Sequence, residues 1–182
     1  MRARLITEVT VDEYLEAEDG ADVRHEYVYG EVFALAGGSV SHNVICANVV
    51  RLLGNAAAQS TCRVYGSDMK LRVEDRLFYY PDAMVVCDPP AADFYETSPC
   101  VIVEVVSPST ARKDRLEKRF SYLALERLQL YLMIDSRKRE ATAYYRQPQG
   151  FEERTFTADD TVSVPCVGAS LRFSELYDKT AL

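Results

Sequence analysis

Two acidic residues stand inside apolar stretches of this sequence. Glu104 lies in VIVEVVSP, residues 101–108, and Asp82 lies in YYPDAMVV, residues 79–86. A continuous apolar run that ends in Ser-Pro is typical of a strand buried on both faces. A carboxylate there must be paired, protonated or bound to a cation, because a lone buried charge costs several kcal/mol or more. On neighbouring strands, the two acids would suit a hard cation such as Mg²⁺, which favours carboxylate oxygens.

The surroundings of Asp82 suggest an irregular strand. If the run is one strand, alternation places Asp82 on the same face as Phe78 and Met84. Pro81 removes a backbone donor in mid-strand, which indicates an edge position or a bulge, as is common beside functional sites. The alternative for Asp82 and Glu104 is that each pairs with an arginine or caps a loop.

The two acids stand in a longer series of motifs. RHEYVYGEV and His42 come first, YYPDAMVV follows, and VIVEVVSPST leads to Asp114, Lys118 and the strand sequence LYLMID. Pro-Asp alone is a weak signal, but Pro-Asp followed by the Glu104 strand and these two residues is specific. The series resembles the Uma family of restriction-endonuclease-like proteins, in the PD-(D/E)XK nuclease superfamily. The resemblance covers most of the chain and implies a core sheet flanked by helices, with Asp82 and Glu104 as metal ligands.

The chain departs from the superfamily pattern at one position. A Glu-x-Lys strand would place a lysine at position 106, on the face of Glu104, but this chain has Val106. The strand therefore lacks the cation that would orient the attacking water and offset developing negative charge. Lys118, which matches the family motif, is the best substitute. Lys70, on the polar face of the preceding expected hairpin, is the alternative.

The helix that carries Lys118 leaves a second interpretation open. Leu116 and Phe120 form part of an apolar stripe, whereas Asp114, Lys118 and Tyr122 lie on the opposite side. Asp114 and Lys118 are four residues apart with the acid first, which is a good surface ion pair. Tyr122 makes the second side partly apolar, so the helix could be buried on both sides.

Glu26 and His42 also fall on positions that resemble the family pattern. Glu26, in the expected N-terminal hairpin, is a possible third acid near the metal, although exposed acids are common on strands. His42 lies one turn before Ile45 on the core stripe of its helix. It is either a ligand or a helix-starting histidine with local partners.

The spacing of apolar residues predicts an α/β domain around a mixed central sheet. The resemblance specifies this further: it implies a restriction-endonuclease-like core flanked by helices, with an N-terminal hairpin and C-terminal strand additions. We expect a single domain over residues 1–182. Helices are expected from a capping box at Thr10–Glu13 to about residue 18, from Ser41 to about residue 58, over 111–127 and briefly over 173–178. Strands are expected in a hairpin that turns near Tyr29-Gly30, in a second hairpin of 64–73 with 77–87, around Glu104, over 128–135 and 140–147, and in the tail.

Composition and charge limit the class of protein. The chain of 182 residues is 48% hydrophobic, yet no apolar run approaches the roughly 20 residues of a membrane helix and none follows the start as in a signal peptide. We therefore expect a cytoplasmic protein with no membrane partner. The net charge of −7 is unusual for a nucleic-acid binder, so positive charge would have to be local, as in ARKDRLEKR (111–119) and SRKR (136–139). The alternative is that these segments are a solvated helix face and a charged turn.

The five cysteines are scattered, odd in number and without Cys-x-x-Cys spacing. This pattern argues against a disulfide framework or a zinc knuckle. Cys87 and Cys100 lie in apolar strand patterns and are predicted to be buried, reduced packing residues. The two histidines, His25 and His42, are far apart in the sequence, so a histidine-rich metal site is not expected.

The leading hypothesis is a Mg²⁺-dependent endonuclease-like protein that hydrolyses phosphodiester bonds, with DNA as the expected substrate. Asp82 and Glu104 would hold Mg²⁺, or Mn²⁺ as a substitute, with the backbone carbonyl of Val105 as a further ligand. Lys118 would hold the attacking water or stabilise the pentacovalent phosphate. A homodimer is expected because double-strand cutting needs two sites. The alternative is a catalytically weak nucleic-acid-binding or accessory module that retains the nuclease fold.

Overall fold

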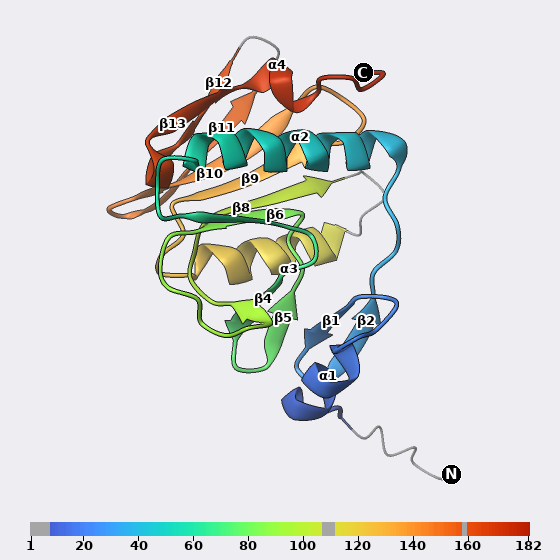
Figure 1. Ribbon diagram of the computed structural model, residues 1–182. Helices are drawn as coiled ribbons and strands as arrows, with labels where there is room; N and C mark the ends of the chain where they lie inside the picture. Colours follow the sequence, from blue (N-terminus) through green and yellow to red (C-terminus); the bar gives the residue numbers. More distant parts are fainter. Residues whose placement is uncertain (1–7, 107–111, 158–159) are drawn as a thin grey trace.

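The fold is built around a mixed six-stranded sheet (Figure 1). The computed structural model describes residues 8–106, 112–157 and 160–182, and for residues 112–115 it describes the backbone alone. The strand order is β11-β10-β9-β8-β6-β3. β8 and β9 are parallel and the other neighbours are antiparallel. The strands are β3 (Arg63–Gly66), β6 (Ala83–Val86), β8 (Pro99–Val106), β9 (Leu130–Asp135), β10 (Ala141–Gln147) and β11 (Gly150–Phe156).

Two helices cover the opposite faces of this sheet (Figure 1). α2 (Val40–Ala57) packs Ile45 against the face that carries Val101. α3 (Arg112–Leu123) packs Tyr122 against the face that carries Ile102. Because side chains alternate along a strand, Glu104 projects to the α3 side with Ile102. β8 is therefore buried on both faces, as its continuous apolar sequence predicts.

The N-terminal part of the chain contributes to a second, five-stranded sheet. Its order is β2-β1-β5-β4-β7, and α1 lies beside it, far from α2 in Figure 1. Tyr14 of α1 packs with Tyr27 and Phe78 in a separate apolar cluster. The capping box between Thr10 and Glu13 forms as expected. The elements are α1 (Val11–Glu18), β1 (His25–Val28), β2 (Glu31–Ala34), β4 (Lys70–Glu74), β5 (Leu77–Tyr79) and β7 (Tyr95–Glu96).

The expected hairpin of 64–73 with 77–87 is divided between the two sheets. β4 pairs with β5 in the five-stranded sheet, whereas β3 pairs with β6 in the six-stranded sheet. The chain changes sheet at Tyr80-Pro81-Asp82, where Pro81 has no amide hydrogen to extend a ladder. The expectation that Phe78 shares a face with Asp82 is therefore wrong. Asp82 stands at the junction of the sheets, one residue before β6.

Two helix boundaries differ from the prediction. α2 is capped by Ser39 and not by Ser41, because the Ser39 hydroxyl accepts a hydrogen bond from the His42 amide. α3 ends at Leu123, four residues before the expected end. The C-terminal additions are β12 (Thr161–Val164), the short 3₁₀ helix η1 (Pro165–Val167), β13 (Ala169–Arg172) and α4 (Phe173–Leu176). The predicted fold class is confirmed, and the single domain stays a prediction.

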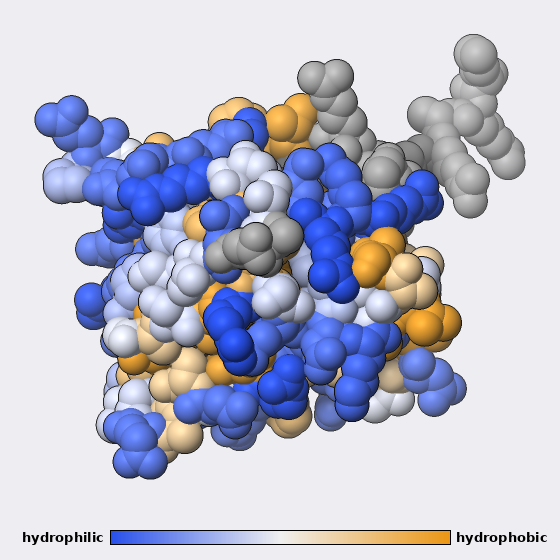
Figure 2. Space-filling view, turned by 90° about the horizontal axis from the view of Figure 1, so that it is seen from above, coloured by the Kyte–Doolittle hydropathy of each residue, from blue (hydrophilic) through white to orange (hydrophobic). Residues whose placement is uncertain are grey.

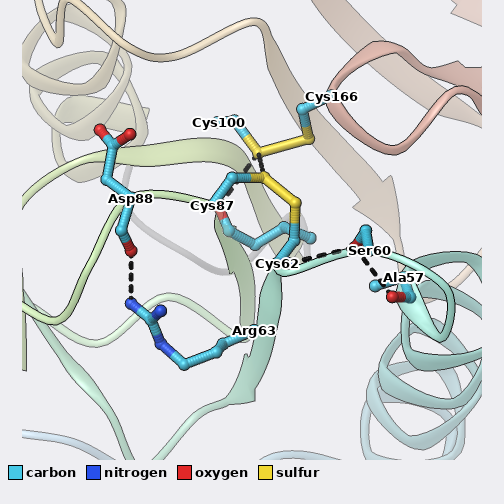
Figure 3. Close-up of a disulfide and its surroundings, with 9 residues drawn as sticks. Ala57, Ser60, Cys62, Arg63, Cys87, Asp88, Cys100 and Cys166 are labelled. Atoms are coloured by element: carbon cyan, nitrogen blue, oxygen red, sulfur yellow. Dashed lines mark hydrogen bonds between the residues drawn. A yellow bond between two sulfur atoms is a disulfide. The ribbon is translucent and has the colours of Figure 1, made fainter.

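The prediction of reduced cysteines is wrong. Cys62 forms a disulfide with Cys87, and Cys100 forms one with Cys166 (Figure 3). The partners are 25 and 66 residues apart in the sequence. They meet only when β3, β6 and β8 lie side by side, so their spacing carried no signal. Cys46, on α2, is the free cysteine.

One face of the molecule is mainly polar. On the face shown in Figure 2, hydrophilic residues predominate and hydrophobic residues form separate small groups. None of the helices in the described part of the chain combines the length and the hydropathy of a membrane span. The cytoplasmic location stays a prediction.

The tight turn between β1 and β2 generates a stability prediction. Tyr29 and Gly30 both have positive φ, 49° and 103°, as a two-residue hairpin turn requires. A Cβ at Gly30 would lie 2.9 Å from the Cβ of Glu8. Gly30→Ala should therefore lower the free energy of unfolding by about 1–3 kcal/mol, as measured by urea denaturation. Gly54→Ala is the control, because a Cβ there meets nothing within 4 Å and a helical alanine should stabilise; equal effects of the two changes would contradict the assignment.

Candidate active site

Asp82 and Glu104 face one another across neighbouring strands. Ala83 of β6 pairs with Val103 of β8, so the next antiparallel pair places Asp82 opposite Glu104. Asp82 Oδ2 accepts a hydrogen bond of 2.7 Å from the amide of Val105. The amide and carbonyl of one strand residue point to the same neighbour, so the Val105 carbonyl also faces the Asp82 side. These three residues therefore present oxygen atoms to one region.

Glu104 is held in an environment that favours its neutral form. The residue is only 9% exposed. Burial raises the pKa of its carboxyl to about 7, and the negative charges of Asp82 and Glu26 act in the same direction. Lys118 and a 2.8 Å hydrogen bond from the Tyr122 hydroxyl oppose this rise. The repulsion from Asp82 and Glu26 would be relieved by a proton or by a cation beside the carboxylates.

Lys118 reaches this pair of acids from α3. Its Nζ lies 2.7 Å from Glu26 Oε1 and 3.6 Å from Glu104 Oε1. It also lies over the ring of Tyr79, 5.2 Å from the centroid. The Lys118 side chain is only 12% exposed. The lysine is therefore part of a buried charge cluster and not a solvated residue of the helix surface.

The orientation of α3 is the reverse of what its apolar stripe suggests. Phe120 is 69% exposed and Leu116 is 38% exposed, whereas Tyr122 is fully buried. Lys118 and Tyr122, one turn apart, are the residues that contact the acids. The polar partners of the buried carboxylates thus determine which side of the helix faces inward. The Asp114 side chain lies outside the described residues.

Glu26 brings the second sheet into the site. It lies on β1 and is 6% exposed. Its Oε1 accepts hydrogen bonds from Lys118 Nζ and, at 3.3 Å, from the amide of Tyr80. Glu26 thus comes from the five-stranded sheet, whereas Asp82 and Glu104 come from the neighbouring chain segments of β6 and β8 in the other. The charge cluster therefore occupies the junction of the two sheets, under α3.

His42 and Cys46 approach Asp82 from α2. His42 Nε2 lies 3.4 Å from Asp82 Oδ1, and its Nδ1 lies 3.6 Å from Cys46 Sγ. The hydrogen bond to Asp82 raises the pKa of His42, and burial opposes this effect. One ligand atom from each of the three residues lies within 4.8 Å of the others. Burial raises the pKa of the Cys46 thiol, so it stays protonated at neutral pH without a metal.

The structure places Lys70 away from this cluster. Its Nζ lies over the ring of Tyr80, 5.7 Å from the centroid. Burial lowers the pKa of Lys70, and the opposing charges are those of Glu18 and Asp19, at the C-terminal end of α1. Lys118, and not Lys70, is thus the lysine that contacts the predicted acids.

The sequence analysis missed Tyr122 and Cys46 as members of the site. Tyr122 donates to Glu104, and Cys46 contacts His42. Each lies four residues after a residue of the family pattern, Lys118 or His42. In a helix that spacing brings side chains to the same face. This four-residue spacing was the signal in the sequence that could have identified Tyr122 and Cys46.

The donor set suits a hard divalent cation. Asp82, Glu104 and the Val105 carbonyl offer oxygen atoms, which Mg²⁺ prefers. Two facing carboxylates, one of which has a raised pKa, repel one another unless a proton or a cation intervenes. These residues therefore fit Mg²⁺, the metal expected from the resemblance to the nuclease superfamily.

The sequence is similar to a protein family and to two proteins of Synechocystis sp.. The model of the Uma2 family, described as "Putative restriction endonuclease", matches residues 11–174. One uncharacterized protein from Synechocystis sp. is 32% identical over 170 residues, which cover 91% of this chain and 90% of the relative. A second one from the same organism is 35% identical over 132 residues, covering 70% and 75%.

A solved structure shares the fold. The crystal structure of "a putative nuclease belonging to DUF820" from Anabaena variabilis has a TM-score of 0.74 to this chain. The superposition covers 93% of this chain and 97% of the Anabaena chain, at 20% sequence identity.

The raised pKa of Glu104 predicts a pH-dependent gain in stability for Glu104→Gln. In the unfolded chain Glu104 ionises near pH 4.5, and in the folded protein near 7. Between these values the folded state binds more protons, so the free energy of unfolding of the wild type falls as pH rises. Glutamine avoids this loss and still accepts from Tyr122. Thermal melts in a metal chelator should show the variant more stable at pH 8, by up to about 3 kcal/mol, with little difference at pH 4.

The pH 4 measurement is the internal control, because all other titrating groups are shared. A constant difference between variant and wild type at both pH values would refute the raised pKa.

Proposed function

The chain belongs to the Uma2 family, and from this premise we propose that it is a Mg²⁺-dependent nuclease that hydrolyses phosphodiester bonds in DNA. The observation that carries the proposal is the contact of Lys118 Nζ with both Glu26 and Glu104. An ammonium beside facing carboxylates is the arrangement that a metal-dependent nuclease needs, here with the lysine on α3 and not at position 106. The family description and the nuclease fold support the same reaction class.

Asp82, Glu104 and the Val105 carbonyl would hold Mg²⁺, with Mn²⁺ as a substitute. A bound divalent ion would polarise the phosphate. It would also lower the pKa of a water molecule bound to it, so that a nucleophile is available at neutral pH. Tyr122 and the amide of Val105 hold the two carboxylates in place by hydrogen bonds. The chain thus prepares the ligands before the ion arrives, which is favourable for binding.

Lys118 is the residue that would act on the reacting groups. Its ammonium would donate to the attacking water or to the phosphate oxygens as negative charge develops. Glu26 accepts a hydrogen bond of 2.7 Å from Lys118, which orients the ammonium. In this proposal Lys118 is catalytic and Glu26 is a positioning residue.

A groove lies beside α3, on the face of β8 that carries Glu104. It has a volume of about 310 Å³, and its lining includes Val106, the basic residues Arg119 and Lys138, and the acids Asp135 and Glu140. Val106 lies on the same strand face as Glu104, two residues further along β8. Arg119 and Lys138 are basic residues of the two segments whose local positive charge the sequence analysis noted. Lys138 Nζ lies 2.7 Å from Glu140 Oε1, so the formal charges of the lining balance, and Arg119 is the basic residue that an entering phosphate would meet.

The second candidate function is a binding or accessory module with the same fold. The absence of lysine at position 106 favours it, and so does the net negative charge.

For the nuclease, we also propose a homodimer, because two sites cut both strands of a duplex.

Metal-dependent cleavage of DNA distinguishes the two functions. With Mg²⁺ or Mn²⁺, the wild type should nick or linearise plasmid DNA, and a chelator should stop the reaction. Asp82→Asn and Glu104→Gln should abolish cleavage, because each removes a metal-ligand charge. The control is Asp75→Asn, at a side chain that is 98% exposed. If the wild type binds DNA but never cuts it with either metal, the binding module is the correct function.

The role of Lys118 is tested by Lys118→Met, with Lys70→Met as the matched control. Both lysines are buried, but only Lys118 contacts the acids. Lys118→Met should remove most cleavage and leave Mg²⁺ binding, measured by calorimetry, because an ammonium is not a ligand. It should also lower the free energy of unfolding by roughly 3–5 kcal/mol, since Glu26 loses a buried charged partner.

Lys70→Met should retain cleavage with a smaller cost in stability, because burial already disfavours the charge of Lys70. Cleavage at the wild-type rate by Lys118→Met, assayed well below its melting temperature, would exclude a catalytic lysine on α3.

A further inference from the structure

Four of the five cysteines meet at one place in the fold (Figure 3). Cys62 comes just before β3, Cys87 just after β6, Cys100 from β8 and Cys166 from η1. The structure joins them in two disulfides, and the two pairs touch, with Cys87 Sγ 3.5 Å from Cys100 Sγ. Two separate disulfides would not need this contact between the pairs.

The strand register explains why the sulfur atoms converge. Arg63 pairs with Val86, so Cys62 and Cys87 are directly opposite at the same end of β3 and β6. A register shift at Val85/Val86 turns Cys100 toward the α2 face of β8, the side on which the other three cysteines also pack. η1, between β12 and β13, brings Cys166 to the same place.

The cluster has the composition and spacing of a site for a soft metal. Ligand atoms of Cys87, Cys100 and Cys166 lie within 4.8 Å of one another, and Cys62 is bonded to Cys87. In a tetrahedral zinc site with four thiolates, the Zn–S bond of about 2.3 Å implies sulfur–sulfur separations of about 3.8 Å. The contact between the two disulfide pairs is already near this value, so side-chain rotations could bring all four sulfur atoms around one ion.

We propose that, in the reduced chain, Cys62, Cys87, Cys100 and Cys166 form a four-thiolate site for Zn²⁺. The disulfides are the oxidised form of the same site. On reduction, each S–S bond takes up two electrons and two protons from a dithiol, which closes to its own disulfide. Zn²⁺ then replaces the four thiol protons. In a reducing compartment a cysteine cluster of this kind is more often a metal site than a pair of disulfides.

The position of the cluster allows an ion to enter and its charge to be solvated. Cys100 is 5% exposed, whereas the other three cysteines are half-buried. A zinc ion with four thiolates carries a net charge of about −2, which would be costly in a closed apolar core. At the half-buried rim of the sheet, water reaches one side of the site.

The zinc site is separate from the carboxylate site. Asp82 and Cys87 are at opposite ends of β6, five residues apart, which corresponds to roughly 16 Å along a strand. The donors also differ, because thiolates select zinc whereas carboxylates and carbonyls suit magnesium. The zinc ion would connect η1, and with it the β12–β13 hairpin, to the ends of β3, β6 and β8.

Metal analysis of the reduced full-length protein tests the proposal. The protein is reduced with a phosphine, loaded with Zn²⁺ or Co²⁺ and desalted. One equivalent of zinc per chain is expected, and the cobalt form should show the intense thiolate-to-metal absorption and visible bands of a tetrahedral site. Cys100→Ser, Cys166→Ser and Cys62→Ser should all lose both signals. Cys62 lies at the rim, so its replacement is the least able to disturb folding. Circular dichroism checks the fold of each.

Two control variants separate this site from the other groups. Cys46→Ser should retain zinc, because Cys46 is outside the cluster, and Asp82→Asn should retain it because the carboxylate site is not involved. The proposal is overturned if reduced wild type binds neither zinc nor cobalt, or if the cluster variants bind them as wild type does. It is equally overturned if thiol titration of the folded, phosphine-treated protein detects Cys46 alone, because the disulfides then never open.

Discussion

One buried ammonium connects the three parts of the structure that form the site. Lys118 belongs to α3, Glu26 to the five-stranded sheet and Glu104 to the six-stranded sheet, and Nζ contacts both carboxylates. Removing one partner of a buried ion pair costs several kcal/mol, since the other charge stays buried and unpaired. The position of α3 and the junction between the sheets therefore depend on the same contact. The residues proposed to do chemistry are also those that hold the fold together at this point.

The sequence alone was a good guide where structure depends on near neighbours. The capping box at Thr10, the turn at Tyr29-Gly30 and the buried strand of Glu104 all follow from local residue types, and all are present. The sequence also marked Pro81 as an irregularity. It could not reveal that the chain changes sheet there, because the choice of strand partners depends on residues far away in the chain. For the same reason the cysteine pairs were missed.

The orientation of α3 shows how a long-range interaction outweighs a local pattern. Burying Phe120 would contribute roughly 1.5–3 kcal/mol through the hydrophobic effect. Turning the helix to do so would withdraw Lys118 from Glu26 and Tyr122 from Glu104, and the loss from uncompensated buried carboxylates is at least as large. The acids are 92 and 18 residues away from these partners in the sequence. Helical periodicity read from residues 112–123 contains no information about them.

The charges gathered at the sheet junction do not sum to zero. When fully ionised, Glu26, Asp82 and Glu104 contribute three negative charges and Lys118 one positive charge, which leaves a formal excess of two. A divalent ion brings this group to electroneutrality, whereas a monovalent ion leaves it negative and a trivalent ion makes it positive. Protonation of His42, beside Asp82, would reduce the excess to one. The formal charge of the junction is therefore the one that the proposed Mg²⁺ would neutralise.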